Sequence, residues 1–348
     1  MSKKNIIAII FFIILSSASL WIYLHITKST IRKELYDFAV TDTASINKIY
    51  LVNKDGSEVL LEKVNPGEWK VNKKHIARRD AIKALLVCIK ELAVKNPVAK
   101  NAIENISKQL ATTGTKIEIY QNDNLIKLYY VGGDAQDGLS TYMLLADHET
   151  GENSTMPFEM FIPGFNGFLS VRYFTDADLW RDRTVFAHSP DKISSITFNP
   201  VQMPDSGFTV SLSTTNEISL HDSKGNLIAY FDTLKMKRYI TYFSNIQYVA
   251  LENKCRQSYK DSILSKKPVF IITLSEKNGK INSLKVFSKP PDDITLINDV
   301  TGKPFTEDPE YMFALVNDDK DFVLIQYYSF GKLFVGNSYF KKKIENRK

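Results

Sequence analysis

The chain has 348 residues, enough for two hydrophobic cores, and its 44% hydrophobic and 24% charged residues are ordinary for a globular protein. Its formal net charge of +6 is concentrated at the ends, because residues 1–37 contribute +3 and residues 341–348 contribute +4, which leaves −1 for the middle. A nucleic-acid-binding domain concentrates basic charge on its folded surface, so we expect no nucleic-acid partner.

An uncharged apolar stretch runs from Ile6 to Leu24, and a helix of ~20 apolar residues crosses a bilayer core. Two lysines precede it, and Trp21 and Tyr23 stand near its far end, where aromatic rings favour the lipid headgroups. We predict a signal anchor that stays in place. A cleaved signal peptide is the alternative, since Ser16-Ser17-Ala18-Ser19 offers small residues for cleavage, but the apolar run continues past them.

This anchor predicts a single-pass protein of a bacterial inner membrane, with a cytoplasmic tip, the anchor and a linker in residues 1–36. A very short N-terminal tail before a long folded part favours an extracytoplasmic position for the bulk of the chain. In a bacterium with two membranes, that position is the periplasm. The membrane is therefore the first expected partner.

The stretch from Ile46 to Val98 predicts strands followed by a helix. Asn53-Lys54-Asp55-Gly56 separates two runs of strand-forming residues, and Asp-Gly at such a point is a strong hairpin signal. A third strand follows around Trp69. The apolar spacing then becomes helical between Ile82 and Leu92, and Asn96-Pro97 predicts the end of the helix region.

The same order of features returns after Ile193, which predicts an internal duplication. Four pairs of residues share an offset of 154, namely Leu85 and Tyr239, Ile89 and Phe243, Val171 and Ile325, and Leu179 and Leu333. Ile117 and Phe270 are related by 153 residues, and Tyr142-Met143 and Tyr311-Met312 by 169. We therefore expect an α+β protein in which a transmembrane helix precedes two similar units of antiparallel sheet plus one amphipathic helix.

The predicted units span residues 37–180 and 181–340, and a basic disordered tail spans 341–348. Within the first unit, a second short helix is expected between Lys100 and Gly114, and Gly132-Gly133 is expected to break a hairpin strand. The two cysteines, Cys88 and Cys255, form no motif. We interpret Cys88 as a small buried hydrophobic residue, and the sequence alone does not decide whether Cys88 and Cys255 form a disulfide.

The order of these features is similar to that of an uncharacterised bacterial family, the domain-of-unknown-function 4340 proteins. In addition to the N-terminal span, the matching parts are Ile46-Asn47-Lys48-Ile49, Trp69-Lys70-Val71, Arg79-Asp80 and Trp180-Arg181-Asp182-Arg183. These motifs are short, although together they cover nearly the whole chain. The resemblance implies a membrane-anchored, repeat-built α+β protein. Since such proteins are often associated with ABC-transporter components of the gliding-motility type, it also implies a transporter partner, and it carries over no catalytic residue.

Two clusters are candidate binding sites. In the first, Trp180, Arg181, Asp182 and Arg183, the arginines either bind a carboxylate or phosphate in bidentate fashion or pair with aspartate to lock one module onto the next. The second is the aromatic stretch 158–168 with Phe161 and Phe165. It is either an exposed contact loop or a loop that packs on its own domain.

Signatures of catalysis are missing from the sequence. The five histidines show no metal spacing, and there is no G-x-S-x-G, P-loop or G-x-G-x-x-G motif. Asp318, Asp319 and Asp321 lack the ligand spacing of a calcium loop and read as a solvated turn. His148-Glu149 reads as a polar loop rather than an acid–base pair. We expect neither a metal nor another cofactor.

These observations favour a non-enzymatic, extracytoplasmic binding or scaffold protein with a protein partner in the envelope, and the family resemblance implies a role accessory to an ABC transporter or another envelope complex. Two alternatives stay open. One is an envelope hydrolase that uses Asp182 or His148, and the other is a glycan- or lipid-binding module that uses exposed aromatic residues.

Overall fold

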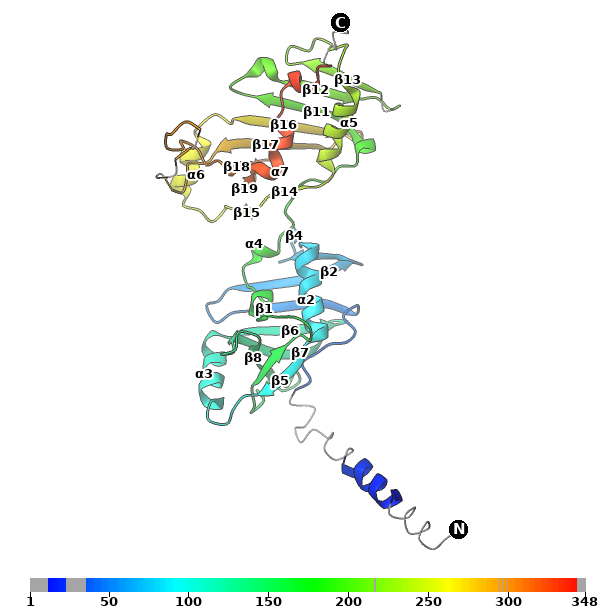
Figure 1. Ribbon diagram of the computed structural model, residues 1–348, viewed down its shortest axis with the longest axis vertical. Coiled ribbons are helices and arrows are strands. Elements are labelled where there is room, and N and C mark those ends of the chain that lie inside the picture. The colour runs from blue at the N-terminus through cyan, green and yellow to red at the C-terminus, as the bar shows by residue number, and fades with distance from the viewer. Residues whose placement is uncertain are drawn as a thin grey trace. The chain divides into compact units, whose positions relative to one another are not determined.

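The computed structural model describes residues 12–22 and 36–342, except residues 216, 294, 296 and 299. The chain divides after Arg181 into two compact units, here called unit 1 and unit 2. Each unit contains one large antiparallel sheet with helices beside it (Figure 1). The predicted α+β class and the two similar sheets are therefore confirmed.

Residues 12–22 form a helix. Within the described parts of the chain, no helix combines the length and the apolar composition that a membrane crossing needs. The predicted span from Ile6 to Leu24 extends at both ends into residues outside the described part. Of the predicted basic tail, 341–348, residues 341 and 342 belong to the described part of the chain and the other six lie outside it.

Unit 1 is built on a nine-stranded sheet of order β4-β3-β2-β1-β6-β7-β8-β9-β5. Its strands are β1 (Ile46–Val52), β2 (Glu58–Asn65), β3 (Glu68–Val71), β4 (His75–Ile76), β5 (Ala93–Pro97), β6 (Thr115–Gln121), β7 (Asn124–Asp134), β8 (Thr141–Ala146) and β9 (Phe158–Phe161). Its helices are α2 (Arg79–Glu91), α3 (Ile103–Thr113), η2 (Ser170–Arg172) and α4 (Ala177–Trp180).

Unit 2 is built on an eight-stranded sheet of order β13-β12-β11-β16-β17-β18-β19-β15. Its strands are β11 (Ile193–Pro200), β12 (Phe208–Leu212), β13 (Ile218–Asp222), β15 (Ala250–Leu251), β16 (Phe270–Glu276), β17 (Ile281–Ser288), β18 (Tyr311–Val316) and β19 (Asp321–Gln326), while β10 (Thr184–Phe186) pairs with β14 (Ile246–Gln247). Its α-helices are α5 (Thr233–Thr241), α6 (Gln257–Leu264) and α7 (Tyr327–Phe330), and its 3₁₀ turns are η3 (Pro190–Lys192), η4 (Pro204–Ser206), η5 (Tyr242–Ser244), η6 (Gly331–Leu333) and η7 (Asn337–Phe340).

The two sheets share one topology. If β4 of unit 1 and the separate β10–β14 pair of unit 2 are set aside, each unit runs three strands, a helix, an edge strand, a second helix and four further strands, and the strands take the same places in both sheets. In unit 1, Leu51 pairs with Val59, and at the matching place in unit 2 Phe198 pairs with Phe208. This shared order and register is what an internal duplication predicts.

The offset of 154 residues holds in the first helix of each unit but fails farther along the chain. It relates the first residues of α2 and α5 and aligns the buried Leu85 with the buried Tyr239. Val171, however, lies in η2 whereas Ile325 lies in β19, so that pairing was wrong. Corresponding loops of the two units differ in length, so one constant offset cannot relate equivalent residues along the whole chain.

Two other predicted pairings were wrong by two residues. The strand registers make Ile117 of unit 1 equivalent to Ile272 of unit 2, not to Phe270, and Met143 equivalent to Ala314, not to Met312. A slip of two residues leaves every side chain on the same face of a strand, because side chains alternate with a period of two. The apolar pattern alone therefore could not detect it.

Each unit carries more than the one amphipathic helix that we predicted. In unit 1, α2 packs on one face of the sheet, and α3 packs on the opposite face against β7 and β8. In unit 2, Ile263 of α6 packs with Phe287, Phe313 and Phe322 in the same way. The short helix predicted between Lys100 and Gly114 is confirmed as α3, whereas the helical pattern of α6 was missed because it buries one residue only.

Two predicted breaks are corrected. β7 runs through Gly132-Gly133 without a break. A glycine is needed at position 132 because a Cβ atom there would lie 2.7 Å from the Cδ2 atom of Leu110 in α3. These glycines therefore permit helix packing and do not end the strand. The Asn96-Pro97 pair likewise lies in β5 and does not end the helix, since α2 already ends at Glu91.

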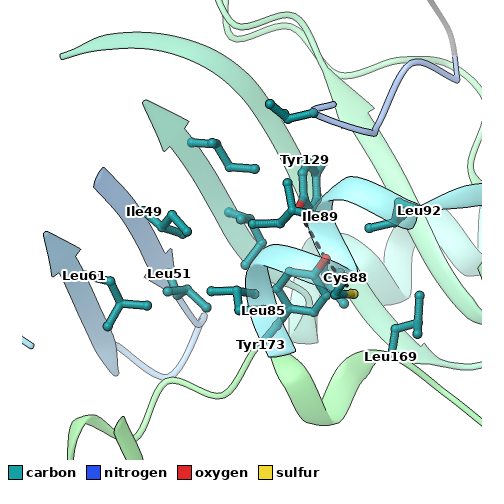
Figure 2. Packing of buried hydrophobic residues seen from close by; sticks show 14 of the residues in the cluster. Ile49, Leu51, Leu61, Leu85, Cys88, Ile89, Leu92, Tyr129, Leu169 and Tyr173 are labelled. Carbon is teal, nitrogen blue, oxygen red and sulfur yellow. Dashed lines mark hydrogen bonds between the residues drawn. The ribbon is translucent and has the colours of Figure 1, made fainter. Parts of the chain in front are cut away.

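The main core of unit 1 lies between α2 and the sheet (Figure 2). Leu85 and Ile89 of α2 are buried with Ile49 and Leu51 of β1. Cys88 belongs to this core as a free thiol, and Cys255 is free as well. The prediction that Cys88 is a buried hydrophobe is therefore confirmed, and neither cysteine forms a disulfide in this structure.

Candidate functional site

The sheet face of unit 1 opposite α2 carries a groove of about 840 Å³. Because side chains alternate along a strand, Ile49 and Leu51 point into the core whereas Lys48 and Tyr50 point into the groove. β2 and β6 add outward residues in the same way. We call this groove the polar groove; its principal side chains are Lys48, Tyr50, Glu58, Glu62, Lys73, Lys74, His75, Glu118, Tyr120, Asp178 and Arg181.

Two tyrosine–carboxylate pairs form the floor of the polar groove. The Tyr50 hydroxyl donates to Glu58, and the Tyr120 hydroxyl donates to Glu118 at 2.7 Å. The hydrogen bond to Glu58 raises the pKa of Tyr50 to about 12, and burial together with the hydrogen bond to Glu118 raises the pKa of Tyr120 to about 12. Both phenols are therefore neutral near pH 7 and serve as hydrogen-bond donors.

Cations stand over and beside these tyrosines. The Lys48 Nζ atom lies 4.2 Å from the centre of the Tyr120 ring and 3.3 Å from a carboxylate oxygen of Asp123. Lys73 and Lys74 occupy the exposed turn between β3 and β4, where Asn72 and Lys73 adopt left-handed φ values of 47° and 62°. This turn raises two ammonium groups at one side of the polar groove.

Arg181 lines the polar groove and is itself largely buried. Its guanidinium Nη1 atom lies 3.6 Å from the Asp178 carboxylate, one helical turn earlier, and its side chain is 10% exposed. Its main chain forms a β-bridge with Ala77, which fixes the segment after α4 against the sheet. The polar groove is thus lined by four cations and four carboxylates, and a mixed-charge surface of this kind suits a polar partner of mixed charge.

The four residues of the Trp180–Arg183 cluster have different surroundings. Trp180 is fully buried, stacks on Phe174 with ring centres 4.2 Å apart and donates its indole N–H to the Phe174 carbonyl. Asp182 accepts a hydrogen bond from the Thr184 backbone N–H at 2.7 Å, and the Arg183 carbonyl accepts one from the Tyr248 N–H. Of the four, Arg181 alone lines the polar groove.

The aromatic stretch packs largely on its own unit. Phe161 is half-buried in β9 and pairs with Ala93 of β5. Phe165 is half-buried in the following loop, and the Arg172 guanidinium lies 4.6 Å from the centre of its ring. Both residues lie outside the polar groove.

The other polar candidates have local structural partners. Asp319 pairs with Lys285, and Asp321 accepts hydrogen bonds from Asn253 and Asn317. His148 is exposed in a turn whose hydrogen bonds are accepted by Asp147. Among the residues that the structure describes, no group of three His, Cys, Asp or Glu side chains could hold a metal ion.

Sequence reasoning missed the floor of the polar groove and a buried histidine. Tyr50 and Glu58 look like ordinary strand residues, and the one available signal was the alternation that places them on the face opposite Leu51 and Val59.

The buried histidine is His188 of unit 2. It is 4% exposed, and its Nδ1 atom lies 2.5 Å from Glu276 and its Nε2 atom 2.8 Å from Asn282. The separation of 88 positions between His188 and Glu276 hides this pair in the sequence.

The fold and the polar groove define a class of protein: two similar α+β units, of which the first carries an open, mixed-charge sheet face. Comparison of the chain with models of known protein families and with curated protein sequences finds no match.

Proposed function

We propose that this chain is a membrane-anchored, extracytoplasmic binding or scaffold protein and that its polar groove binds a protein partner. The observation that carries the proposal is the groove itself, an open sheet face with fixed tyrosine hydroxyls and ions of both signs. Side chains held by hydrogen bonds in the free protein lose little conformational freedom on binding, which favours recognition.

The charges favour a protein over a polyanion. Lys73, Lys74 and Arg181 line the same groove as Glu58, Glu62 and Glu118, so no single sign dominates. Like charges brought together at an interface cost several kcal/mol, and a phosphate-rich ligand would meet the carboxylates. A protein segment with both lysine and glutamate side chains satisfies both signs.

The anchor and the envelope setting belong to the same proposal. They rest on the uncharged stretch from Ile6 to Leu24 and its flanking residues. The link to an ABC transporter or a related envelope complex rests on the resemblance of the chain to the domain-of-unknown-function 4340 proteins.

Affinity purification from gently solubilised membranes tests the proposal. The wild-type chain is expected to recover one or a few membrane proteins, and Lys73→Glu/Lys74→Glu is expected to reduce that recovery at least tenfold. Lys100→Glu/Lys108→Glu is the matched control, because it makes the same change of charge at two exposed residues outside the groove. Recovery of abundant contaminants alone, or equal recovery by both variants, would count against the proposal.

A further inference from the structure

A second groove of unit 1 lies beside α2, on the face of the sheet opposite the polar groove. Its volume is about 360 Å³, and we call it the α2 groove. Trp69 of β3 and Ile82 of α2 form its floor and are only 4% and 5% exposed, whereas Val87 at its side is 45% exposed. The α2 groove is therefore an apolar recess with an apolar lip.

Cations surround this recess. Lys63, Arg79, Lys83 and Lys90 all line the α2 groove, and none of its lining residues is Asp or Glu. One of these cations is paired with a carboxylate outside the lining, since the Lys90 Nζ atom lies 3.5 Å from the Glu91 Oε1 atom. The charge at the rim is therefore strongly positive, in contrast to the balanced charge of the polar groove.

The cations on α2 follow a regular spacing. Lys83 and Lys90 are seven residues apart, which is about 10 Å along a helix, and Arg79 lies one turn before Lys83. Leu86 and Val87 lie between them in the groove lining. A helix laid along α2 would complement this row if its apolar side chains entered the recess and its carboxylates recurred every two turns.

We propose that the α2 groove binds an acidic amphipathic helix of a partner protein. The concave shape favours a helix over a lipid surface, because the floor residues Trp69 and Ile82 are recessed and cannot reach into a flat bilayer. Helix-in-groove recognition uses apolar anchors at a spacing of three and four residues together with flanking charges. This contact is additional to the one proposed for the polar groove and does not depend on it.

A synthetic peptide provides the probe. It would have about 18 residues, or five helical turns, with leucine on one face and glutamate on the other, and a fluorescent label for anisotropy. Saturable binding to the full chain in a mild detergent is expected, and the affinity is expected to fall as salt rises, since salt screens exposed charges. A peptide with lysine in place of glutamate is expected not to bind.

Substitutions locate the binding. Lys83→Glu/Lys90→Glu should weaken binding of the acidic peptide at least tenfold, and Lys83→Gln/Lys90→Gln should weaken it less. Lys100→Glu/Lys108→Glu should leave the affinity unchanged. Far-ultraviolet circular dichroism would verify that each variant keeps its secondary structure.

Three results would overturn the proposal. The first is the absence of saturable peptide binding, and the second is equal binding by Lys83→Glu/Lys90→Glu and the wild type. The third is binding of soluble dihexanoyl-phosphatidylglycerol, measured by calorimetry and lost in that variant, without binding of the peptide. That third result would assign the α2 groove to lipid headgroups.

Discussion

Trp180 shows how the environment of a single residue decides its role. It was a candidate for recognition, yet its ring is fully buried among Phe174 and the core residues of unit 1. Trp180→Ala is expected to destabilise unit 1 by about 3–5 kcal/mol, because truncating a buried aromatic residue loses its packing and leaves a cavity. Chemical denaturation followed by circular dichroism measures this loss. Trp180→Phe, which keeps a ring, should lose clearly less, and equal losses would contradict the packing role.

The two thiols are expected to differ in reactivity. Burial raises the pKa of Cys88 to about 11, and its sulfur lies 3.3 Å from the Tyr173 hydroxyl (Figure 2). Because the thiolate is the reactive form, Cys88 should react with a thiol reagent only after unfolding, whereas the half-buried Cys255 should react in the native protein. Thiol titration before and after denaturant tests this difference, and two rapidly reacting native thiols would refute it.

The His188–Glu276 pair predicts a pH dependence in unit 2. The hydrogen bond from His188 lowers the pKa of Glu276 below its usual value of 4.5. A carboxylate with a lowered folded-state pKa stabilises the native state above its unfolded pKa, and this contribution is lost as pH falls through the lowered pKa. Thermal unfolding between pH 5 and pH 2 should therefore show a steeper loss of stability in the wild type than in Glu276→Gln. Parallel profiles for the two proteins would be evidence against this role.

Among the elements, the connection between β17 and β18 depends on one buried lysine. Lys289 is 7% exposed, and its Nζ atom lies 2.5 Å from an Asp292 oxygen and 2.9 Å from an Asp308 oxygen. Removing one partner of a buried ion pair leaves the other partner's charge uncompensated. Lys289→Ala should therefore speed proteolysis within residues 290–308. Lys285→Ala is the control, because its pair with Asp319 is exposed and contributes only about 0–1 kcal/mol. Equal cleavage rates for the two variants would contradict the prediction.

Individual elements also show what the sequence could predict. Asp55-Gly56 marked the β1–β2 hairpin, because Gly56 has a φ of +86° that most other residues avoid. The spacing of apolar residues located α2 and α5. In contrast, β15 has two residues, and α6 buries only Ile263, so neither element presents enough periodic positions to be recognised.

The candidate site was less predictable than the fold. Arg181 was identified because its cluster is unusual in composition, whereas Tyr50, Glu58 and Glu118 become a site only when three strands place them on one face. That placement depends on strand registers between residues far apart in the chain. Turn signals and periodicity act over a few residues and do not contain this information.

At the scale of the molecule, each unit has its own main core. Among the described residues, the main core of unit 1 contains no residue beyond Trp180, and the main core of unit 2 begins at Val185. We therefore expect residues 182–342 to fold when produced alone, with near-ultraviolet circular dichroism typical of packed aromatic residues and a cooperative thermal transition. Lack of both signals would show that unit 2 depends on the rest of the chain.

The central claim, that the polar groove of an anchored protein binds a protein partner, is tested most directly by site-specific photo-crosslinking in intact cells. A photoreactive amino acid at position 74, in the turn beside the groove, is compared with the same amino acid at position 108 on α3. The account predicts a crosslinked adduct with one envelope protein from position 74 and none from position 108. No adduct from position 74, or the same adduct from both positions, would contradict it.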